Sequence, residues 1–415
     1  MGSNWRMANQ KVWRPLIATT VAACTLAGVI SFPNVVSAST SFPSSTYELY
    51  AGHGFGVAAT SNPNTGCSEV FLTTDFSHWR NITPPLKVPS SVPKGQCLYV
   101  WTDAYFTSST DGWLLARNGG STDTILRHTL DGGRTWITQP GGDTGSNGGW
   151  ETISFTNSSV GWRQQFGDGS NGHFALQRTL NGGTTWSTRS PDPHGSCVFA
   201  NDVFSSASVG FAVAPEAPAI NSTHLWKTGD GGINWSVLTL APPPALPRTA
   251  VGLYGEPKFS GPNGVVSVDF PVNDHQAIYF YETHNGGLSW KLEVSPGLPV
   301  VVSGKLKINH EIATQPCTLD VSAVSGQVAI VALANATTWW ILQPGPKGAT
   351  TKLIVTGSGA GIATYNVIDL PATTGHPELA VLNAHDALLT FAIPAGYKTT
   401  YETSDGGATW VKVSP

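Results

Sequence analysis

An eight-residue pattern, Thr-x-Asp/Asn-Gly-Gly-x-x-Trp, recurs along this chain of 415 residues and constrains its fold more than any other feature. Five copies match it in full, at residues 129–136, 179–186, 228–235, 283–290 and 403–410. A sixth copy, TTDFSHW, ends at Trp79, is one residue shorter and lacks the glycines. Self-similarity of this kind indicates a repeat architecture, in which each copy marks one structural unit.

The spacing of the copies predicts seven units. Successive tryptophans are 57, 50, 49, 55 and 120 residues apart, and the last step equals two ordinary steps with one eroded copy between them. A second landmark precedes the tryptophan by 23 to 25 residues, at Phe55, Trp113, Trp162, Phe211 and Val265. We place the eroded sixth unit at about residues 317–355 and expect extra residues in the seventh at about 384–395. Constant spacing within units of unequal length indicates a fixed strand-turn-strand core with variable outer loops.

Each unit divides into four short strands, which the third unit places at residues 152–156, 161–165, 173–178 and 185–189. Four-stranded units of this length are typical of propeller blades, because such a sheet buries both faces only when neighbours stack around an axis. A low charged fraction of 12%, with 46 glycines and 29 prolines, agrees with short strands and tight turns. We predict an all-β fold: a seven-bladed β-propeller of four-stranded antiparallel blades over residues 46–415, preceded by an N-terminal signal or anchor segment at residues 1–38.

The polar residue of the pattern has a structural role in this interpretation. An Asp or Asn side chain accepts hydrogen bonds from backbone amides across a turn, the glycines supply positive φ, and the tryptophan adds apolar surface to the blade. Asn replaces Asp in two of the five copies, so a negative charge is not required, whereas catalysis or metal binding would require it. The residues assigned this role are Asp131, Trp136, Asn181, Trp186, Asp230, Trp235, Asn285, Trp290, Asp405 and Trp410.

The copies resemble the Asp-box of bacterial neuraminidase repeats. The longer pattern ISFTNSSVGWRQQ followed by QRTLNGGTTW is similar to the photosystem II assembly/stability factor family of seven-bladed propellers, and AYFTSSTDGWLLA with RHTLDGGRTW repeats it. The resemblance covers residues 46–415. It implies a non-catalytic, extracytoplasmic binding or assembly scaffold. No segment carries over a photosystem-binding residue.

Sialidases and xyloglucanases resemble the chain in the same boxes, so a glycoside hydrolase is the alternative function. A sialidase needs an arginine cluster, but Arg127, Arg134 and Arg178 belong to third strands and box turns, at the wrong end of a propeller. Xyloglucan hydrolysis needs two opposed carboxylates in a cleft. No His-Glu-x-x-His or Gly-x-Ser-x-Gly segment is present. We predict no catalytic residue, no metal site and no cofactor.

A set of acidic residues is the candidate binding site, because each lies near the start of a predicted innermost strand. If the strand registers agree, the side chains converge on one mouth of the central channel and favour a hard cation such as Ca²⁺ or an amine. Alternatively they are solvated, or they bond backbone groups of adjacent blades. The set is Glu48, Asp103, Glu151, Asp202, Glu256, Asp320 and Asp369.

Four cysteines follow the leader, an even number with no Cys-x-x-Cys spacing, which favours disulfides over zinc. Cys67 falls in a loop between the second and third strands, and Cys97 opens the next inner strand. Strand alternation puts both on one face, so we predict that they pair. Cys197 and Cys317 open inner strands two blades apart and would pair only if their loops reach.

The first 38 residues resemble an export signal. Arg6, Lys11 and Arg14 precede an apolar run over residues 16–32 and the small-residue site Val36-Ser37-Ala38. An uncleaved membrane anchor and a lipobox ending at Cys24 are the other interpretations. Removal of the leader takes the formal charge from −4 to −7, which argues against nucleic acid. We expect a secreted or membrane-anchored protein whose partner is a protein of the cell envelope, a glycan being the other class.

Overall fold

The structure is a computed structural model, and it describes the chain at residues 38–39, 46–52, 54–61, 67–85, 99–118, 124–139, 152–165, 175–189, 200–215, 223–272, 275–294, 300–303, 307–308, 324–325, 330–335, 338–343, 352–357, 363–367, 378–392 and 398–413. The chain divides into two units, Met1–Val36 and Ser37–Pro415, and all described residues belong to the second. Within these ranges the secondary structure is strand and turn only, which confirms the all-β class. Among the described residues, no helix long and apolar enough to cross a membrane is found.

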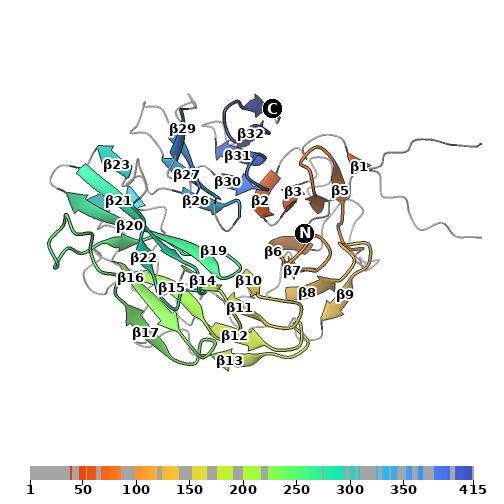
Figure 1. Cartoon of the computed structure of the whole chain (residues 1–415). Helices are drawn as coiled ribbons and strands as arrows, with labels where there is room; N and C mark the ends of the chain where they lie inside the picture. The colour runs from red at the N-terminus through yellow and green to blue at the C-terminus, as the bar shows by residue number, and fades with distance from the viewer. Residues whose placement is uncertain are drawn as a thin grey trace, which may run out of the picture. The chain divides into compact units, whose positions relative to one another are not determined.

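We number the larger sheets 1 to 7 in chain order (Figure 1). Sheet 1 contains β2 (Thr46–Gly52), β3 (Phe55–Ser61), β4 (Ser68–Thr73) and β5 (Trp79–Asn81), with β1 (Ala38–Ser39) paired to β5. Sheet 2 contains β6 (Tyr99–Phe106), β7 (Gly112–Asn118), β8 (Thr124–Thr129) and β9 (Ile137–Gln139). Sheet 3 contains β10 (Thr152–Phe155), β11 (Gly161–Gln165), β12 (Ala175–Thr179) and β13 (Ser187–Arg189). Sheet 4 contains β14 (Ala200–Phe204), β15 (Gly210–Pro215), β16 (Thr223–Thr228) and β17 (Trp235–Leu238).

Sheet 5 contains β18 (Leu253–Tyr254), β19 (Lys258–Ser260), β20 (Asn263–Val272), β21 (His275–Thr283), β22 (Lys291–Leu292) and β23 (Val300–Ser303). Sheet 6 contains β26 (Ile330–Leu333), β27 (Thr338–Gln343), β28 (Lys352–Gly357) and β29 (Ala363–Val367). Sheet 7 contains β30 (Glu378–Val381), β31 (Ala387–Ala392), β32 (Lys398–Thr403) and β33 (Val411–Lys412). A separate pair joins β24 (Lys307–Ile308) to β25 (Val324–Ser325).

Contacts between neighbouring sheets run around a closed series, which is the defining feature of a β-propeller. The inner strand β6 contacts β4 of sheet 1 and β10 of sheet 3, and β10 contacts β14. Sheet 5 contacts β16 through β18 and β26 through β19. The series closes because β30 contacts both β26 and the first inner strand β2, and Figure 1 shows β2 and β30 side by side.

The predicted count of seven four-stranded blades needs a correction. Six sheets have the regular order of four antiparallel strands, sheet 1 with β1 added at its outer edge. Sheet 5 departs from this order, because its inner edge is divided into β18 and β19 and its strand β21 pairs with both β22 and β23. The Gly255 amide donates to the Ser267 carbonyl between the two inner pieces. Pro257 directly precedes β19, and a residue without an N–H interrupts the hydrogen-bond ladder there.

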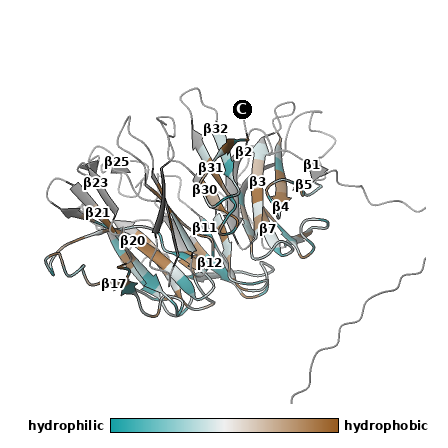
Figure 2. Cartoon of the chain, turned by 45° about the horizontal axis from the view of Figure 1, so that its top comes forward, coloured by the Kyte–Doolittle hydropathy of each residue, from teal (hydrophilic) through white to brown (hydrophobic). Residues whose placement is uncertain are grey.

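The core lies between the sheets. Alternate residues of a strand face opposite neighbours, so the first four residues of β8 are buried and half-buried in turn. Trp113, Leu115 and Leu126 of sheet 2 pack on Ile153 and Phe155 of sheet 3 as one cluster. Figure 2 shows the hydrophobic residues on strands such as β3, β4 and β20. Burial between sheets explains why a single four-stranded unit would not be stable alone.

Three predictions about the repeat need correction. Box threonines pair with the glycine that opens the second strand, as Thr129 pairs with Gly112, and Thr73 pairs with Gly56 in sheet 1. The landmark of the first unit is therefore Val57, the residue after that glycine, and not Phe55. Sheet 6 spans residues 330–367, about a strand and a turn beyond the predicted 317–355. The supposed extra residues 384–395 contain β31, the second strand of sheet 7.

Candidate functional site

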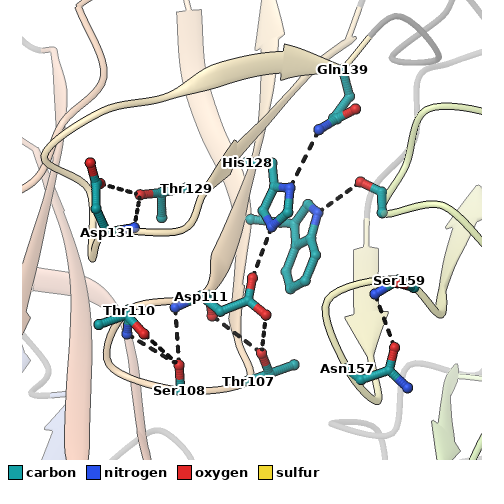
Figure 3. Close-up of polar contacts among 12 residues, drawn as sticks. Thr107, Ser108, Thr110, Asp111, His128, Thr129, Asp131, Gln139, Asn157 and Ser159 are labelled. Carbon is teal, nitrogen blue, oxygen red and sulfur yellow. Dashed lines mark hydrogen bonds and ion pairs between the residues drawn. The ribbon is translucent and has the colours of Figure 1, made fainter.

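Six turns between third and fourth strands carry the repeated pattern, and we call them box turns: residues 73–79, 129–136, 179–186, 228–235, 283–290 and 403–410. The Thr129 hydroxyl donates to Asp131 Oδ1 at 2.9 Å and accepts from the Gly133 amide at 2.7 Å. Asp131 Oδ1 accepts the Thr135 amide at 2.8 Å, and Oδ2 accepts the Thr135 hydroxyl at 2.6 Å. Figure 3 shows Asp131 turned toward Thr129. Both carboxylate oxygens are thus engaged inside the turn.

Asparagine maintains the same turn by reversing one hydrogen bond. Asn181 Oδ1 accepts the Thr185 amide at 2.8 Å, while Asn181 Nδ2 donates to the Thr185 hydroxyl at 2.9 Å. Asn285 bonds Ser289 in the same way, at 3.0 and 2.8 Å. A hydroxyl both donates and accepts, so it satisfies either side chain. The geometry accounts for the exchange of Asp and Asn without any need for charge.

The hydrogen bonds of the turn favour the ionised carboxylate. Bonds from the side chain and amide of Thr409 and from Thr403 lower the pKa of Asp405 to about 2. Burial raises the pKa of Asp131 and of Asp230, but hydrogen bonds within each turn outweigh it and leave both pKa values below the ordinary range. A general acid needs a pKa near the working pH, so these carboxylates are unsuited to that role.

Box turns also connect neighbouring sheets. The indole Nε1 of Trp113 in sheet 2 donates to the Gly182 carbonyl of sheet 3 at 3.0 Å, and Trp162 Nε1 donates to the Gly231 carbonyl of sheet 4 at 3.2 Å. The first box glycine bonds back within its own sheet, as the Gly182 amide donates to the Ser159 carbonyl at 2.8 Å. We call the contact between the box turn of one sheet and the preceding sheet a seam.

The glycine that opens the second strand has a steric reason. A Cβ at Gly112 would lie 2.2 Å from the ring of Phe106, and one at Gly161 would lie 2.3 Å from the ring of Phe155. The ring of the first strand therefore covers the glycine. Phe155 also stacks on Trp113 of the preceding sheet, with ring centroids 3.6 Å apart and an interplanar angle of 3°. The repeated glycine-aromatic pair is thus part of the packing between sheets.

A buried histidine forms a polar network at the seam between sheets 2 and 3 (Figure 3). His128 Nε2 lies 2.8 Å from Asp111 Oδ1, and Gln139 Nε2 lies 3.4 Å from His128 Nδ1. Thr107 donates to Asp111 Oδ2 at 3.0 Å. The imidazole stacks on Trp113 with centroids 4.2 Å apart. Both ring nitrogens face polar side chains, so the histidine is held in one orientation and serves the packing.

The predicted acidic ring is only partly described. Asp103 Oδ2 accepts the backbone amide of Ile153 in the next inner strand at 2.7 Å, and its Oδ1 accepts the Ala104 amide at 2.8 Å. Glu256 forms an ion pair with Lys258 at 3.0 Å. Asp103 therefore has the structural role that was the alternative to cation binding, because its carboxylate bonds backbone amides of two sheets.

The remaining acids have no described side chains. Glu48 lies in β2 and Asp202 in β14, at register shifts in the pairing of these strands; β6 has a similar shift next to Asp103. Glu151, Asp320 and Asp369 lie outside the described residues. The inner strands of sheets 6 and 7 are described as Ile330–Leu333 and Glu378–Val381, and the predicted strand starts near Asp320 and Asp369 stay predictions.

Cys67 is disulfide-bonded. Cys97, Cys197 and Cys317 lie outside the described residues, so the pairing of Cys67 with Cys97 and of Cys197 with Cys317 stays a prediction. Within the part of the chain that the structure describes, no group of three or more His, Cys, Asp or Glu side chains could hold a metal ion.

Sequence reasoning missed two features that contain charged groups. Asp269 on β20 is 8% exposed, and burial raises the pKa of its carboxyl to about 7. It lies opposite Ile278, which packs in the core between sheets 5 and 6. Arg178 and Arg189 lie together at the seam between sheets 3 and 4. Alignment of the repeats position by position was the only sequence signal for the arginine pair.

Comparisons with known proteins agree with the fold and leave the activity open. No protein-family model matches the chain, and no curated protein matches it in sequence. A solved prolyl endopeptidase is similar over 89% of this chain and 49% of its own, with 12% identity and a TM-score of 0.55.

Two further solved structures are similar at lower TM-scores. YCF48 bound to a D1 peptide shares 16% identity over 79% of this chain and 87% of its own, with a TM-score of 0.43. The GH74 xyloglucanase from Xanthomonas campestris shares 13% identity over 90% of this chain and 53% of its own, with a TM-score of 0.45. Identities this low are informative about the fold alone.

Proposed function

We propose that this chain is a non-catalytic binding or assembly scaffold exported from the cytoplasm, with a protein of the cell envelope as its partner. The resemblance of its repeats to Asp-box propellers of the photosystem II assembly factor type supports this class. The observation that carries it is the engagement of the repeated carboxylates: Asp131 and Asp103 use their oxygens to hold turns and sheets together. Such groups serve the framework, and the variable loops are then left to bind.

The loops between sheets supply the contact surface in this proposal. Box turns lie at the same end of the strands as the turns between first and second strands. The amide of Gly182, in a box turn, donates to the carbonyl of Ser159, in the turn between β10 and β11. The loops from one sheet to the next lie at the opposite end of the strands. One of them, residues 241–248 between sheets 4 and 5, is described and contains prolines at 242, 243, 244 and 247. We assign this loop to the binding face.

This loop is held firmly to its scaffold. The Tyr281 hydroxyl donates to the Ala241 carbonyl at 2.7 Å, and the Leu240 amide donates to the Tyr254 hydroxyl at 3.2 Å. Burial raises the pKa of Tyr281 to about 12. Arg248 is exposed, and nearby Val251 is 60% exposed. A preorganised loop that presents an apolar and a cationic side chain loses little entropy on binding.

The test is capture from an envelope extract of the source cell, with a glycoside panel assayed on the same preparation. We expect a stable protein partner and no turnover. An Arg248→Glu/Val251→Glu double variant should lose the partner, while Leu130→Glu, a matched change of an exposed residue on a box turn, should retain it. Turnover of a glycoside without a protein partner would establish the glycoside hydrolase alternative instead.

A further inference from the structure

Four positions recur at each seam and can be compared across the repeats. The first directly precedes the glycine of the second strand, and the second lies three residues before the box Asp or Asn. The third position is on the fourth strand of the same sheet. Its residue pairs with the third-strand residue that lies five before the box Asp or Asn. The fourth lies on the box turn of the next sheet, three residues after its Asp or Asn. At the seam between sheets 2 and 3 they are Asp111, His128, Gln139 and Thr184.

The seam between sheets 2 and 3 satisfies its own polar groups. His128 bonds Asp111 and Gln139, as Figure 3 shows, and the Thr184 hydroxyl donates to Gln139 Oε1 at 3.1 Å. One carboxylate, one imidazole, one amide and one hydroxyl thus form a continuous chain across the seam. The negative group of this chain is the side chain of Asp111, so the seam needs no bound anion.

The next seam, between sheets 3 and 4, has two cations and no acid at these positions. Arg178 replaces the histidine, Arg189 replaces the glutamine, and the acid and the threonine are replaced by Val160 and Ile233. Neither arginine belongs to any ion pair described in the structure. Burial lowers the pKa of Arg178 most, and the nearby charge of Arg189 lowers it further.

The two arginine side chains flank one box turn, Arg178 through its guanidinium and Arg189 through the base of its side chain. A Cβ at Gly231 would lie 2.9 Å from Arg178 Nη1, and a Cβ at Gly232 would lie 3.5 Å from Arg189 Cβ. Arg178 is placed over the ring of Trp162, 5.5 Å from its centroid. The Nε atoms of both arginines are buried and lack a hydrogen-bond partner. Both residues are half-buried, so part of each side chain is open to solvent.

At the seam between sheets 4 and 5, a single cation is satisfied by the backbone and needs no ligand. Lys227 occupies the second position between sheets 4 and 5, and its ammonium donates to the Gly287 carbonyl at 3.0 Å. Leu238 takes the third position, so no second charge is present. The arginine pair therefore differs from both neighbouring seams in having excess positive charge with unused donors.

We propose that the seam between sheets 3 and 4 is an oxyanion-binding site, in which Arg178 and Arg189 bind a sulfate, phosphate or carboxylate group. Guanidinium groups match these anions through paired N–H donors. The bound anion takes the place that Asp111 fills at the preceding seam, and the exposed side chain of Ile233 borders it. Weakly hydrated planar cations held between two sheets have less water to lose than exposed lysines.

The test is thermal unfolding of the purified protein in sodium sulfate and in sodium acetate, each against sodium chloride at equal ionic strength. A ligand that binds the folded state raises Tm in a saturable way. We expect this rise with sulfate and acetate, and expect Arg178→Gln and Arg189→Gln each to weaken the apparent affinity by about tenfold or more. Arg134→Gln, which alters an exposed box-turn arginine, should respond like the wild type.

Two further measurements make the test independent of any single variant. Val160→Asp supplies an internal carboxylate at the place of Asp111 and should abolish the sulfate response while the protein stays folded. In the wild type, ¹⁵N spectra should show the Nε–H signals of Arg178 and Arg189 shifting on addition of sulfate. An equal response to chloride, or unchanged Nε–H signals, would overturn the site. The assay requires no protein partner, so its result is separate from that of the capture experiment.

Discussion

The indole of Trp113 lies flat on the ring of Phe155, 3.6 Å between centroids, although the two residues belong to adjacent sheets. The same arrangement recurs one repeat later, where Trp162 stacks on Phe204 at 3.6 Å. In each case the box tryptophan of the second sheet meets the phenylalanine edge-on, as Trp186 meets Phe155 at 72°. Aromatic groups from three segments of the chain thus hold each of these two pairs of sheets together.

Removal of the Phe155 ring should destabilise the whole propeller. Phe155 is 2% exposed, so Phe155→Ala leaves a cavity between sheets 2 and 3, and we expect a loss of about 3–5 kcal/mol in the free energy of unfolding. Leu130 is 61% exposed, so Leu130→Ala should change the free energy of unfolding by less than about 0.5 kcal/mol. Denaturant unfolding measures both. Equal losses would show that the seam does not carry the stability.

The box carboxylate should be replaceable by its amide but not by a methyl group. Asp131→Asn retains the acceptor for the Thr135 amide, and the Thr135 hydroxyl can turn to accept a bond, so we expect a change below about 0.5 kcal/mol. Asp131→Ala removes the bonds and should cost about 1–2 kcal/mol. Trp136→Ala should cost roughly 3 kcal/mol or more. A large loss in Asp131→Asn would mean that the charge matters.

Much of the fold was predictable from local signals. Strands of the third unit were placed within one or two residues of β10 to β13, because the box turn and the glycine of β11 fix the register. Sheet 6 was misplaced because both signals are lost: Thr338 stands where the glycine is expected, and Gly357 stands opposite it, where the threonine is expected. Trp340 and neighbouring apolar residues stabilise that sheet instead.

The seams were beyond sequence reasoning for a physical reason. Each joins positions from two repeats, and their meeting depends on how far one sheet turns relative to the next. Arg178 and Arg189 are separated by a turn in the sequence but lie on one face, because Leu176 pairs with Arg189 and Arg178 lies two residues further along β12. The role of Asp103 likewise follows only once the amide of Ile153 is seen beside it.

The second box glycine should tolerate no side chain. Gly133 has a φ of 83°, and a Cβ there would lie 2.6 Å from Ile82 Cβ of the preceding sheet. Gly54 has a φ of 80° with nothing within 4 Å, so it is a matched control for the backbone effect alone. Gly54→Ala should cost about 1–2 kcal/mol, and Gly133→Ala should cost clearly more, by about 1–3 kcal/mol of overpacking. If chemical denaturation gave the same loss of stability for Gly54→Ala and Gly133→Ala, the close contact of Gly133 with the preceding sheet would be refuted.

The buried carboxyl of Asp269 should make stability depend on pH in a defined direction. Burial raises its pKa to about 7, above the value of an unfolded aspartate, so the folded state binds the proton more tightly. The stability that protonation provides is complete below the unfolded pKa and is lost as the pH rises toward the folded pKa. Between about pH 4 and pH 7 the wild type should lose up to roughly 1.4 kcal/mol per pH unit relative to Asp269→Asn.

The measurement is denaturant unfolding of the wild type and Asp269→Asn at several pH values across this window. The amide has the shape of the protonated acid and does not titrate, so the difference between the two proteins isolates the carboxyl. The same substitution at Asp405, where the pKa is lowered to about 2, is a control that should leave the pH dependence above pH 4 unaltered. Parallel curves for the wild type and Asp269→Asn would show that the carboxyl is ionised in the folded protein throughout, and that water or a neighbouring group reaches it between sheets 5 and 6.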